Sequence, residues 1–431
     1  MSKSRRPWNE STNLRIYFAI LLALLPRLLS LNAFITWDEP MWTYRSIRFM
    51  AALLRGDLAG TFLVGHPGVI TMLCGAVGIA VRRFLLGRGA ADFGWLSGLP
   101  ALDPRDVEAL RRLAHFLPAA KLPMAVLNAA CVGGVYLLAR RLFDAKVAFV
   151  AALLLALDPF HLALSRVLHL DAPAANFMIL SLLSLLLYLR RRSRSHLILS
   201  GALAGLAFLS KSYSLFLVPF TGLLLAAAYL RLGRFREAPP LGGAQSKSNL
   251  SVPPAGGGEA AFSFALWCLV AALAFCALWP AMWADPVGTV RGVLDTALGY
   301  AATPYETSKF FLGRVVDDPG PLFYPVVLAF RTAPLVWLGL LAAILCLFTH
   351  LRISESRRFE IISLLAYACL FAASMSLGAK KFDRYMLPAV VALDVVAAWG
   401  LVELGKLGIG SWRLEIGSWK LEVGHWSLVI A

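Results

Sequence analysis

Long apolar stretches alternate with short polar loops along nearly the whole chain. They lie near 16–34, 66–81, 117–139, 147–164, 173–189, 197–210, 213–230, 261–283, 322–350, 360–378 and 385–404. A helix needs roughly 20 apolar residues to cross about 30 Å of hydrocarbon. The 66–81 stretch is shorter, contains three glycines and ends at Arg82 and Arg83, which favours a helix that lies in the interface. The pattern predicts an all-α polytopic membrane protein with about ten transmembrane helices.

Basic residues predict how these helices are oriented. If 66–81 does not cross, the basic loops at 140–146, 190–196, 231–260 and 351–359 share one side with the basic N-terminal tail. If it crosses, those loops move to the other side, against the positive-inside rule. We therefore expect both termini in the cytoplasm, and 35–115 as a long outer segment with short interfacial helices. The first stretch lacks a small-residue cleavage site, so we expect it to remain as a spanning helix.

The composition agrees with a membrane protein. Among 431 residues, 59% are hydrophobic and 15% are charged, and the mean hydropathy is +0.70. A soluble domain carries about 25% charged residues, so soluble and disordered classes are disfavoured. The net charge of +16 is concentrated in loops between apolar stretches, so we expect no nucleic-acid partner. The six cysteines all lie in apolar stretches and are expected to be small buried hydrophobes.

The chain divides into a cytoplasmic tail (1–15), a membrane domain (16–405) and a low-complexity tail (406–431). Within the membrane domain, 232–260 is rich in Pro, Gly and Ser and is predicted to be a flexible cytoplasmic linker. The final tail repeats GSWRLEI, GSWKLEV and GHWSLVI. Apolar and polar residues alternate within each repeat, which favours strands over helix.

Ionisable residues gather where helices are expected to reach the outer side. The first group is Trp37-Asp38-Glu39-Pro40, where proline biases Glu39 towards an extended conformation. Adjacent extended residues point opposite ways, so one carboxylate would face the protein and the other an outer partner. Asp38 is a candidate general base. The alternative is a helix-ending turn with solvated charges.

The second group runs through LDPFHLALSRVLHLDAP and contains Asp158, His161, Arg166, His169 and Asp171. Asp171 could simply cap the next helix, because Pro173 suits a first turn. The density of ionisable groups favours a functional site. Capping and function do not exclude one another.

The third group is Lys380-Lys381-Phe382-Asp383-Arg384-Tyr385. A helical turn would aim Lys380 and Arg384 at one point, which suits a phosphate or pyrophosphate. The alternative is snorkelling to lipid headgroups. His66 and Lys211 are smaller signals of the same kind, and Asp394 in the last span has no assigned role.

In their order, the Asp-Glu pair, His66-Pro67, SRVLHLDAP, LSKS and KKFDRYMLP resemble the GT-C superfamily of polyprenyl-phosphate-sugar-dependent glycosyltransferases. The pattern is similar to protein O-mannosyltransferases and lipid A aminoarabinose transferases, over residues 14 to 400. The resemblance implies a catalytic membrane domain with a cavity at the outer face. It also implies a polyprenyl-phosphate sugar donor and an acceptor protein, lipid or glycan.

Residue by residue, the resemblance implies that Asp38 is the first-loop acidic residue and Asp171 the second acidic residue of the cavity. With Glu39 they form the candidate catalytic set. The candidate residues for the donor phosphate are His66, Arg166, Lys211, Lys380, Lys381, Arg384 and Tyr385. No cofactor is required, although carboxylates at Asp38 and Asp171 would suit a divalent metal. The chain departs from the family at Gly68, where proline is usual, and in stopping after ten spans with a repeat tail.

We expect the chain to lie in the lipid bilayer of the plasma (inner) membrane. Two other functions compete with sugar transfer. A transporter or flippase for a lipid-linked or anionic solute would place its binding groups near the midplane, where Asp394 is the clearest charge. No convincing repeat relates the two halves of the chain. A non-catalytic membrane scaffold would not depend on Lys380, Lys381 or Arg384.

Overall fold

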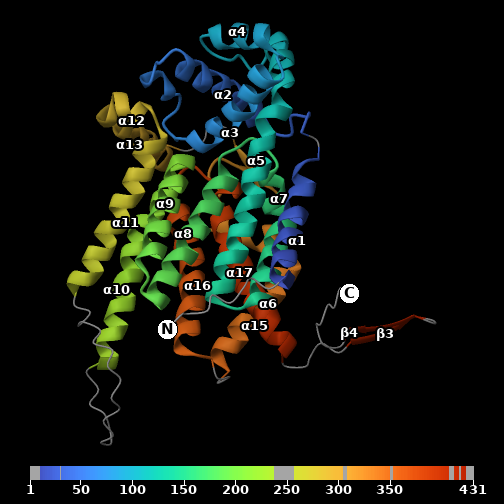
Figure 1. Ribbon diagram of the computed structural model, residues 1–431. Coiled ribbons are helices and arrows are strands. Elements are labelled where there is room, and N and C mark those ends of the chain that lie inside the picture. Colours follow the sequence, from blue (N-terminus) through green and yellow to red (C-terminus); the bar gives the residue numbers. More distant parts are fainter. Residues whose placement is uncertain are drawn as a thin grey trace, which may run out of the picture.

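Long helices form a bundle, and short helices lie across one end of it (Figure 1). The structure is a computed structural model that describes residues 10–29, 31–236, 257–303, 308–349, 353–406, 412–416 and 419–423. We call the end covered by the short helices the cavity end, because the candidate site lies there.

The long helices and their breaks make up the bundle. They are α1 (Glu10–Arg27), α5 (Val107–Leu142), α6 (Ala145–Leu157), α7 (Pro159–Ser165), α8 (Asp171–Arg191), α9 (Arg194–Ser210), α10 (Leu217–Arg236), α11 (Gly257–Leu278), α14 (Phe323–Arg331), α15 (Pro334–Phe348), α16 (Glu355–Ser376) and α17 (Leu387–Lys406), with 3-10 turns η3 (Ser212–Phe216) and η4 (Asp383–Met386). Six are long and apolar enough to cross a membrane in the described part of the chain, or eight if two bent pairs each count as one span. The predicted count of ten is not confirmed.

Both bent pairs break at a proline that starts the second helix. The α6–α7 pair bends by 62° and the α14–α15 pair by 107°. Proline lacks an N–H and suits a first helical turn, so each break falls at Pro159 or Pro334. At the first break, Asp158 accepts a hydrogen bond from the His161 backbone N–H and caps α7.

The short helices at the cavity end confirm those predicted within 35–115. They are α2 (Asp38–Leu54), η1 (Ala59–Thr61), α3 (Val69–Ala80), the π-helical turn η2 (Val81–Leu85) and α4 (Ala90–Gly98). The apolar 66–81 stretch forms the 12-residue α3, which is too short to span a bilayer. A second group at this end, α12 (Ala281–Ala284) and α13 (Pro286–Ala302), was not predicted.

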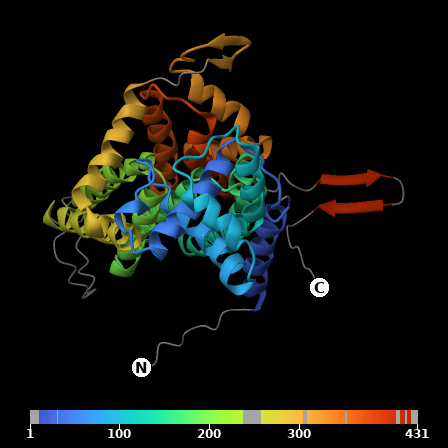
Figure 2. The ribbon, with the colours of Figure 1, turned by 90° about the horizontal axis from the view of Figure 1, so that it is seen from above.

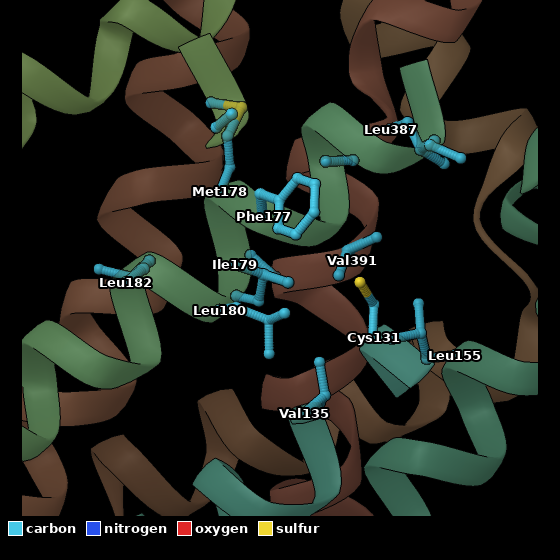
Figure 3. Packing of buried hydrophobic residues seen from close by; sticks show 14 of the residues in the cluster. Cys131, Val135, Leu155, Phe177, Met178, Ile179, Leu180, Leu182, Leu387 and Val391 are labelled. Carbon is cyan, nitrogen blue, oxygen red and sulfur yellow. The ribbon is translucent and has the colours of Figure 1, made fainter. Parts of the chain in front are cut away.

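Helices α8 and α17 form the centre of the bundle. Their most apolar windows are 94% and 89% buried, against 17% for α11, which therefore lies at the periphery. Figure 3 shows Phe177 and Leu180 of α8 among side chains of neighbouring helices such as Val391 and Cys131. Gly400 of α17 allows close contact with α15, because a Cβ there would lie 2.0 Å from a carbonyl oxygen.

Two antiparallel hairpins complete the described structure: β1 (Lys309–Phe311) with β2 (Arg314–Val316), and β3 (Trp412–Ile416) with β4 (Trp419–Val423). The second hairpin confirms the strands predicted in the first two repeats of the tail, and the third repeat lies outside the described residues. The predicted linker is too wide at both ends, because α10 reaches Arg236 and α11 begins at Gly257. The rest of that linker, and residues 1–9 of the predicted tail, lie outside the described residues.

Candidate active site

A cavity of about 360 Å³ lies at the cavity end of the bundle. Several segments that are distant in sequence bring polar side chains to it. They include the start of α2, the loop before α3, the turn before α8 and the segment before α17, which contribute among others Asp38, His66, His169 and Arg384. Aromatic side chains, including Trp37, Trp42 and Tyr300, fill much of the remaining wall.

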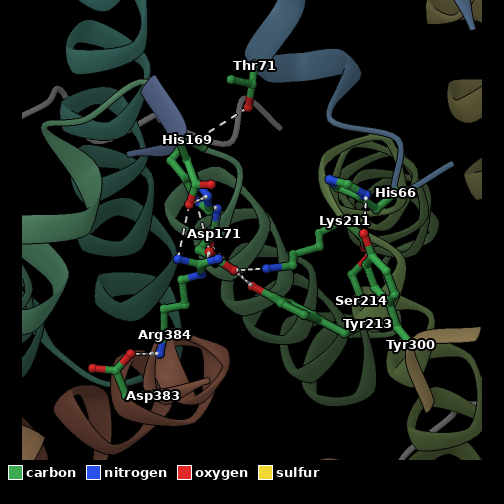
Figure 4. Close-up of polar contacts among 11 residues, drawn as sticks. His66, Thr71, His169, Asp171, Lys211, Tyr213, Ser214, Tyr300, Asp383 and Arg384 are labelled. Carbon is green, nitrogen blue, oxygen red and sulfur yellow. Dashed lines mark hydrogen bonds and ion pairs between the residues drawn. The ribbon is translucent and has the colours of Figure 1, made fainter. Parts of the chain in front are cut away.

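Two carboxylates are joined by a histidine and an arginine. His169 Nε2 lies 3.2 Å from Asp38 Oδ2, and His169 Nδ1 lies 2.9 Å from Asp171 Oδ2. Arg384 also reaches both, with Nη1 3.1 Å from Asp38 Oδ2 and Nε 3.4 Å from Asp171 Oδ2. Figure 4 shows His169 and Arg384 converging on Asp171. Both aspartates occupy first helical turns, where the helix dipole favours a negative charge.

Asp171 is fully buried and is held by further partners. Lys211 Nζ forms an ion pair with its Oδ1, and the Tyr213 hydroxyl donates to the same oxygen at 3.2 Å. The Lys211 ammonium lies 4.3 Å from the centre of the Tyr385 ring. Burial lowers the pKa of Lys211 to about 8, although the Asp171 charge opposes this shift. Asp171 and Lys211 therefore form the buried floor of the site.

Asp38 is the accessible carboxylate. Its side chain is 36% exposed, and the ion pairs with His169 and Arg384 both use Oδ2, so Oδ1 remains available to a ligand. The hydrogen bond from His169 lowers the pKa of Asp38 to about 2, with the Arg384 charge acting in the same direction. Asp38 is thus ionised at neutral pH and can accept a proton from a hydroxyl group that enters the cavity.

Cations line the cavity beside Asp38. Arg45 lies 4.7 Å from the centre of the Trp42 ring, and Lys380 Nζ lies 3.7 Å from the centre of the Tyr300 ring. His66 Nδ1 lies 3.2 Å from the Tyr300 hydroxyl. Burial, reinforced by the charges of Lys211 and Arg45, lowers the pKa of His66 to about 3. His66 is therefore neutral, and the positive charge of the wall comes from arginine and lysine.

Glu39 does not line the cavity, contrary to the prediction. Glu39 is fully buried and forms an ion pair with Lys121, Oε1 to Nζ 2.9 Å. The extended conformation predicted for it is also wrong, because α2 begins at Asp38 and tolerates Pro40 in its first turn. The helical turn itself separates the two carboxylates, so Asp38 lines the cavity while Glu39 packs inside the protein.

Two predicted phosphate ligands also lie away from the cavity wall. Arg166 donates to the Leu29 carbonyl oxygen at 2.9 Å, and Lys381 Nζ pairs with Asp318 Oδ1 at 3.0 Å. The helical turn expected to aim Lys380 and Arg384 together is absent, because regular structure in this segment begins at η4. Lys380 and Arg384 nevertheless both line the cavity, as do His66, Lys211 and Tyr385.

Sequence reasoning missed several residues of the cavity. Asp38, Trp42 and Arg45 are spaced as i, i+4 and i+7, so treating this segment as a helix would have placed them on one face. His169 belongs to the second group of ionisable residues but is not among the predicted site residues. Tyr300 carried no signal, since it lies in a segment for which no helix was predicted.

A divalent metal between Asp38 and Asp171 does not fit this arrangement well. Three of the four carboxylate oxygens, Asp38 Oδ2 and both oxygens of Asp171, already face Arg384, His169 or Lys211. In the part of the chain that the structure describes, no three His, Cys, Asp or Glu residues are grouped as metal ligands. Fixed side-chain cations thus occupy the positions between the carboxylates.

Comparison with known proteins addresses the fold. The dolichyl-phosphate-mannose-protein mannosyltransferase family model matches residues 116–242. ArnT from Cupriavidus metallidurans, solved with bound undecaprenyl phosphate, superposes with a TM-score of 0.59 at 14% identity, covering 93% of this chain and 63% of ArnT. The chain has the GT-C glycosyltransferase fold.

A second relative has the same fold. Archaeal oligosaccharyltransferase AglB from Archaeoglobus fulgidus, in complex with an inhibitory peptide and a dolichol-phosphate, superposes with a TM-score of 0.50 at 16% identity. The match covers 95% of this chain and 53% of AglB. The chain thus spans less than two thirds of the length of either GT-C protein. No curated protein sequence matches it. The predicted GT-C-like fold is confirmed, and the chain is an integral membrane protein.

Proposed function

We propose that the chain is a membrane glycosyltransferase that moves a sugar from a polyprenyl-phosphate donor to an acceptor nucleophile. The observation that carries this proposal is a single cavity in which an accessible, ionised Asp38 lies beside a wall of cations. A base for the acceptor and positive charge for a phosphate leaving group are the two requirements of this reaction.

In this scheme, the acceptor oxygen attacks the anomeric carbon of the sugar while Asp38 Oδ1 accepts the acceptor's proton. The bond between the anomeric carbon and the phosphate oxygen breaks, and its electron pair leaves with the lipid phosphate. Arg384, Arg45 and Lys380 stabilise the charge that develops there. These fixed cations supply the charge, so the scheme needs no divalent metal.

The buried floor has a positioning role. Asp171, held by Lys211 and Tyr213, fixes the orientation of both His169 and Arg384. Those two side chains in turn hold Asp38 by Oδ2 and direct Oδ1 to the cavity. Mutual positioning of this kind keeps the base within reach of the proton that it abstracts.

The donor class and the membrane side rest on separate arguments. The ArnT and AglB structures contain polyprenyl or dolichyl phosphates, which supports a lipid-phosphate donor here. Basic loops next to α5, α8 and α16, with Arg190 and Arg357 both near Leu142, gather at the end away from the cavity, which supports a cavity that opens away from the cytoplasm at the plasma membrane. The acceptor is a protein hydroxyl, a lipid or a glycan.

The test is sugar transfer from a polyprenyl-phosphate sugar by purified protein in proteoliposomes. Asp38→Asn is expected to lower kcat by about 10² to 10⁴, the contribution of a positioned general base. The matched control Asp295→Asn changes an exposed carboxylate outside the cavity and should leave kcat unchanged. Wild-type activity in Asp38→Asn would remove Asp38 from catalysis.

A second pair of variants tests the cation wall. Arg384→Gln is expected to reduce transfer strongly, whereas Arg166→Gln, which lies off the cavity wall, should not. The same vesicles test the competing transporter function. Uptake of an anionic or lipid-linked solute without any sugar transfer would favour the transporter.

A further inference from the structure

Helix α13 forms one rim of the cavity and has a large exposed apolar face. It lies at the cavity end of the bundle in Figure 1. Seen from above in Figure 2, a helix of the same colour runs lengthwise along the edge of the molecule and leads to the β1–β2 hairpin. Helix α13 therefore lies across the bundle axis.

The residues of α13 divide into three sectors around its axis. Val287, Val290, Leu294 and Leu298 are all exposed, and at roughly 100° per residue they fall within an arc of about 80°. The next sector contains the exposed charged residues Arg291 and Asp295. The third sector, with Thr289, Val293 and Tyr300, faces the protein. A helix with one face on protein, one apolar face and one charged face is suited to the corner between protein, bilayer and water.

The protein-facing sector fits closely against the loop before α3. A Cβ added at Gly292 would lie 2.6 Å from the Phe62 ring, and one at Gly65 would lie 1.9 Å from Thr296 Oγ1. Tyr300 on the same side contacts His66. Because this face is fully used by the protein, the apolar sector must meet something else.

The apolar surface continues beyond α13 in both directions. Trp283 of α12 is 60% exposed, and the cross-strand pair Phe310 and Val315 of the hairpin is more than 70% exposed. The hairpin is fixed at two points: Asp318, just after β2, pairs with Lys381 ahead of α17, and Phe311, next to the turn, packs on Phe323 of α14. Each strand has three residues, so the hairpin is only about 10 Å long.

We propose that α12, α13 and the β1–β2 hairpin bind the lipid surface of the bilayer that surrounds the bundle, with Val287, Val290, Leu294, Leu298, Phe310 and Val315 in contact with acyl chains. Two observations favour lipid over a protein partner. The surface flanks membrane-spanning helices at one end of their spans, and amphipathic interfacial elements enter the headgroup and acyl boundary by about 5–10 Å. Arg291 and Arg314 border the apolar residues and are placed to meet anionic headgroups.

This surface also connects the bilayer to the cavity. The helix that presents Leu294 and Leu298 to lipid presents Tyr300 to His66 at its opposite face. Lipid contact therefore holds one cavity wall in place. The inference depends on the membrane location of the chain and not on the proposed transfer chemistry, so the two can fail separately.

Spin labels test the surface in proteoliposomes of phosphatidylethanolamine and phosphatidylglycerol. In a variant lacking the native cysteines, labels are placed at Val290→Cys, Leu294→Cys and Leu298→Cys, with Arg291→Cys and Asp295→Cys as matched controls on the same helix. We expect collisions with oxygen to exceed collisions with a water-soluble nickel chelate several-fold at the three apolar positions. The two controls should show the reverse.

A second measurement avoids the cysteine-free background. A photoreactive benzophenone amino acid at position 294 of the otherwise wild-type chain is expected to crosslink to lipid, and the same group at position 295 is not. Equal nickel accessibility at positions 294 and 295, or a lack of lipid crosslinks at 294, would overturn the proposal. So would shielding that arises only when an acceptor polypeptide is added, because the surface would then bind protein.

Discussion

Glu39 forms a buried ion pair with Lys121, which distinguishes it from Asp38, the proposed general base. Both side chains are fully buried, and the ion pair measures 2.9 Å. The Glu39 carboxylate also accepts hydrogen bonds from the backbone N–H groups of Ile35, Thr36 and Leu168. Lys121 has one further acceptor, the Ala33 carbonyl oxygen at 3.0 Å. Replacing Glu39 or Lys121 by methionine therefore leaves the other charge with very different numbers of hydrogen-bond partners.

Removing one partner of a buried ion pair costs about 3–5 kcal/mol. After Lys121→Met the carboxylate keeps three N–H donors and the N-terminal dipole of α2, so we expect the lower end, about 3 kcal/mol. Glu39→Met leaves a buried ammonium with one acceptor, and it removes the acceptor of three N–H groups, of which the buried one, that of Leu168, costs about 1–3 kcal/mol when it has no partner. We therefore expect Glu39→Met to cost about 5 kcal/mol or more. The double variant should fall between the two, since it removes the unpaired charge but not the orphaned N–H groups.

The assay is the free energy of unfolding in lipid bicelles, measured by steric trapping for wild type, both single variants and the double variant. Sugar transfer is measured on the fraction that remains folded. The reasoning is refuted if Lys121→Met is the more destabilising change. It is also refuted if Glu39→Met folds normally and loses transfer as Asp38→Asn does, because Glu39 would then be catalytic.

Three further predictions follow from the electrostatics. His66 has a pKa of about 3 when folded against an ordinary 6.5, so the unfolded chain binds more protons and wild type should lose stability as pH falls through that window. Thermal melting of His66→Gln should show a smaller loss than wild type, and equal losses would contradict the prediction. In His169→Phe the pKa of Asp38 should rise from about 2 towards its ordinary 3.8. The acid limb of the kcat/KM profile should then move to higher pH, and a profile that coincides with that of wild type would show that His169 does not control the Asp38 pKa. Both carboxylate oxygens of Asp394 are buried without a hydrogen-bond partner among the described residues. Asp394→Asn should therefore keep the stability of the fold or raise it by up to about 1–3 kcal/mol. A clear loss of stability in a thermal melt would contradict this expectation.

Residues that share a short segment were predicted best. The apolar stretches became helices, the short 66–81 stretch became α3, and the alternating tail became a hairpin. Spacing along one element also places Asp38, Trp42 and Arg45 on one face of α2. Periodicity is a local property, so it can be read without knowledge of the rest of the chain.

Contacts between segments were predicted less well. Glu39 and Asp38 are neighbours in sequence and both acidic, yet Glu39 pairs with Lys121 on α5 while Asp38 faces the cavity. Lys380 and Lys381 diverge in the same way, because Asp318 from a distant loop takes Lys381 out of the cavity wall. Residue type alone does not identify which member of such a pair finds a buried partner.

The amino-acid sequence by itself determined the membrane class, the course of most helices and the clustering of acidic and basic residues at helix ends, since hydropathy and charge act through nearest neighbours. The tertiary structure decided which of those charges meet. His169 and Arg384 are more than 200 residues apart in sequence, and both contact Asp38 and Asp171. Tyr300 contacts His66 from α13, a helix that the sequence pattern did not predict. Such contacts depend on how α2, α8, α13 and α17 pack, which is a property of the whole bundle.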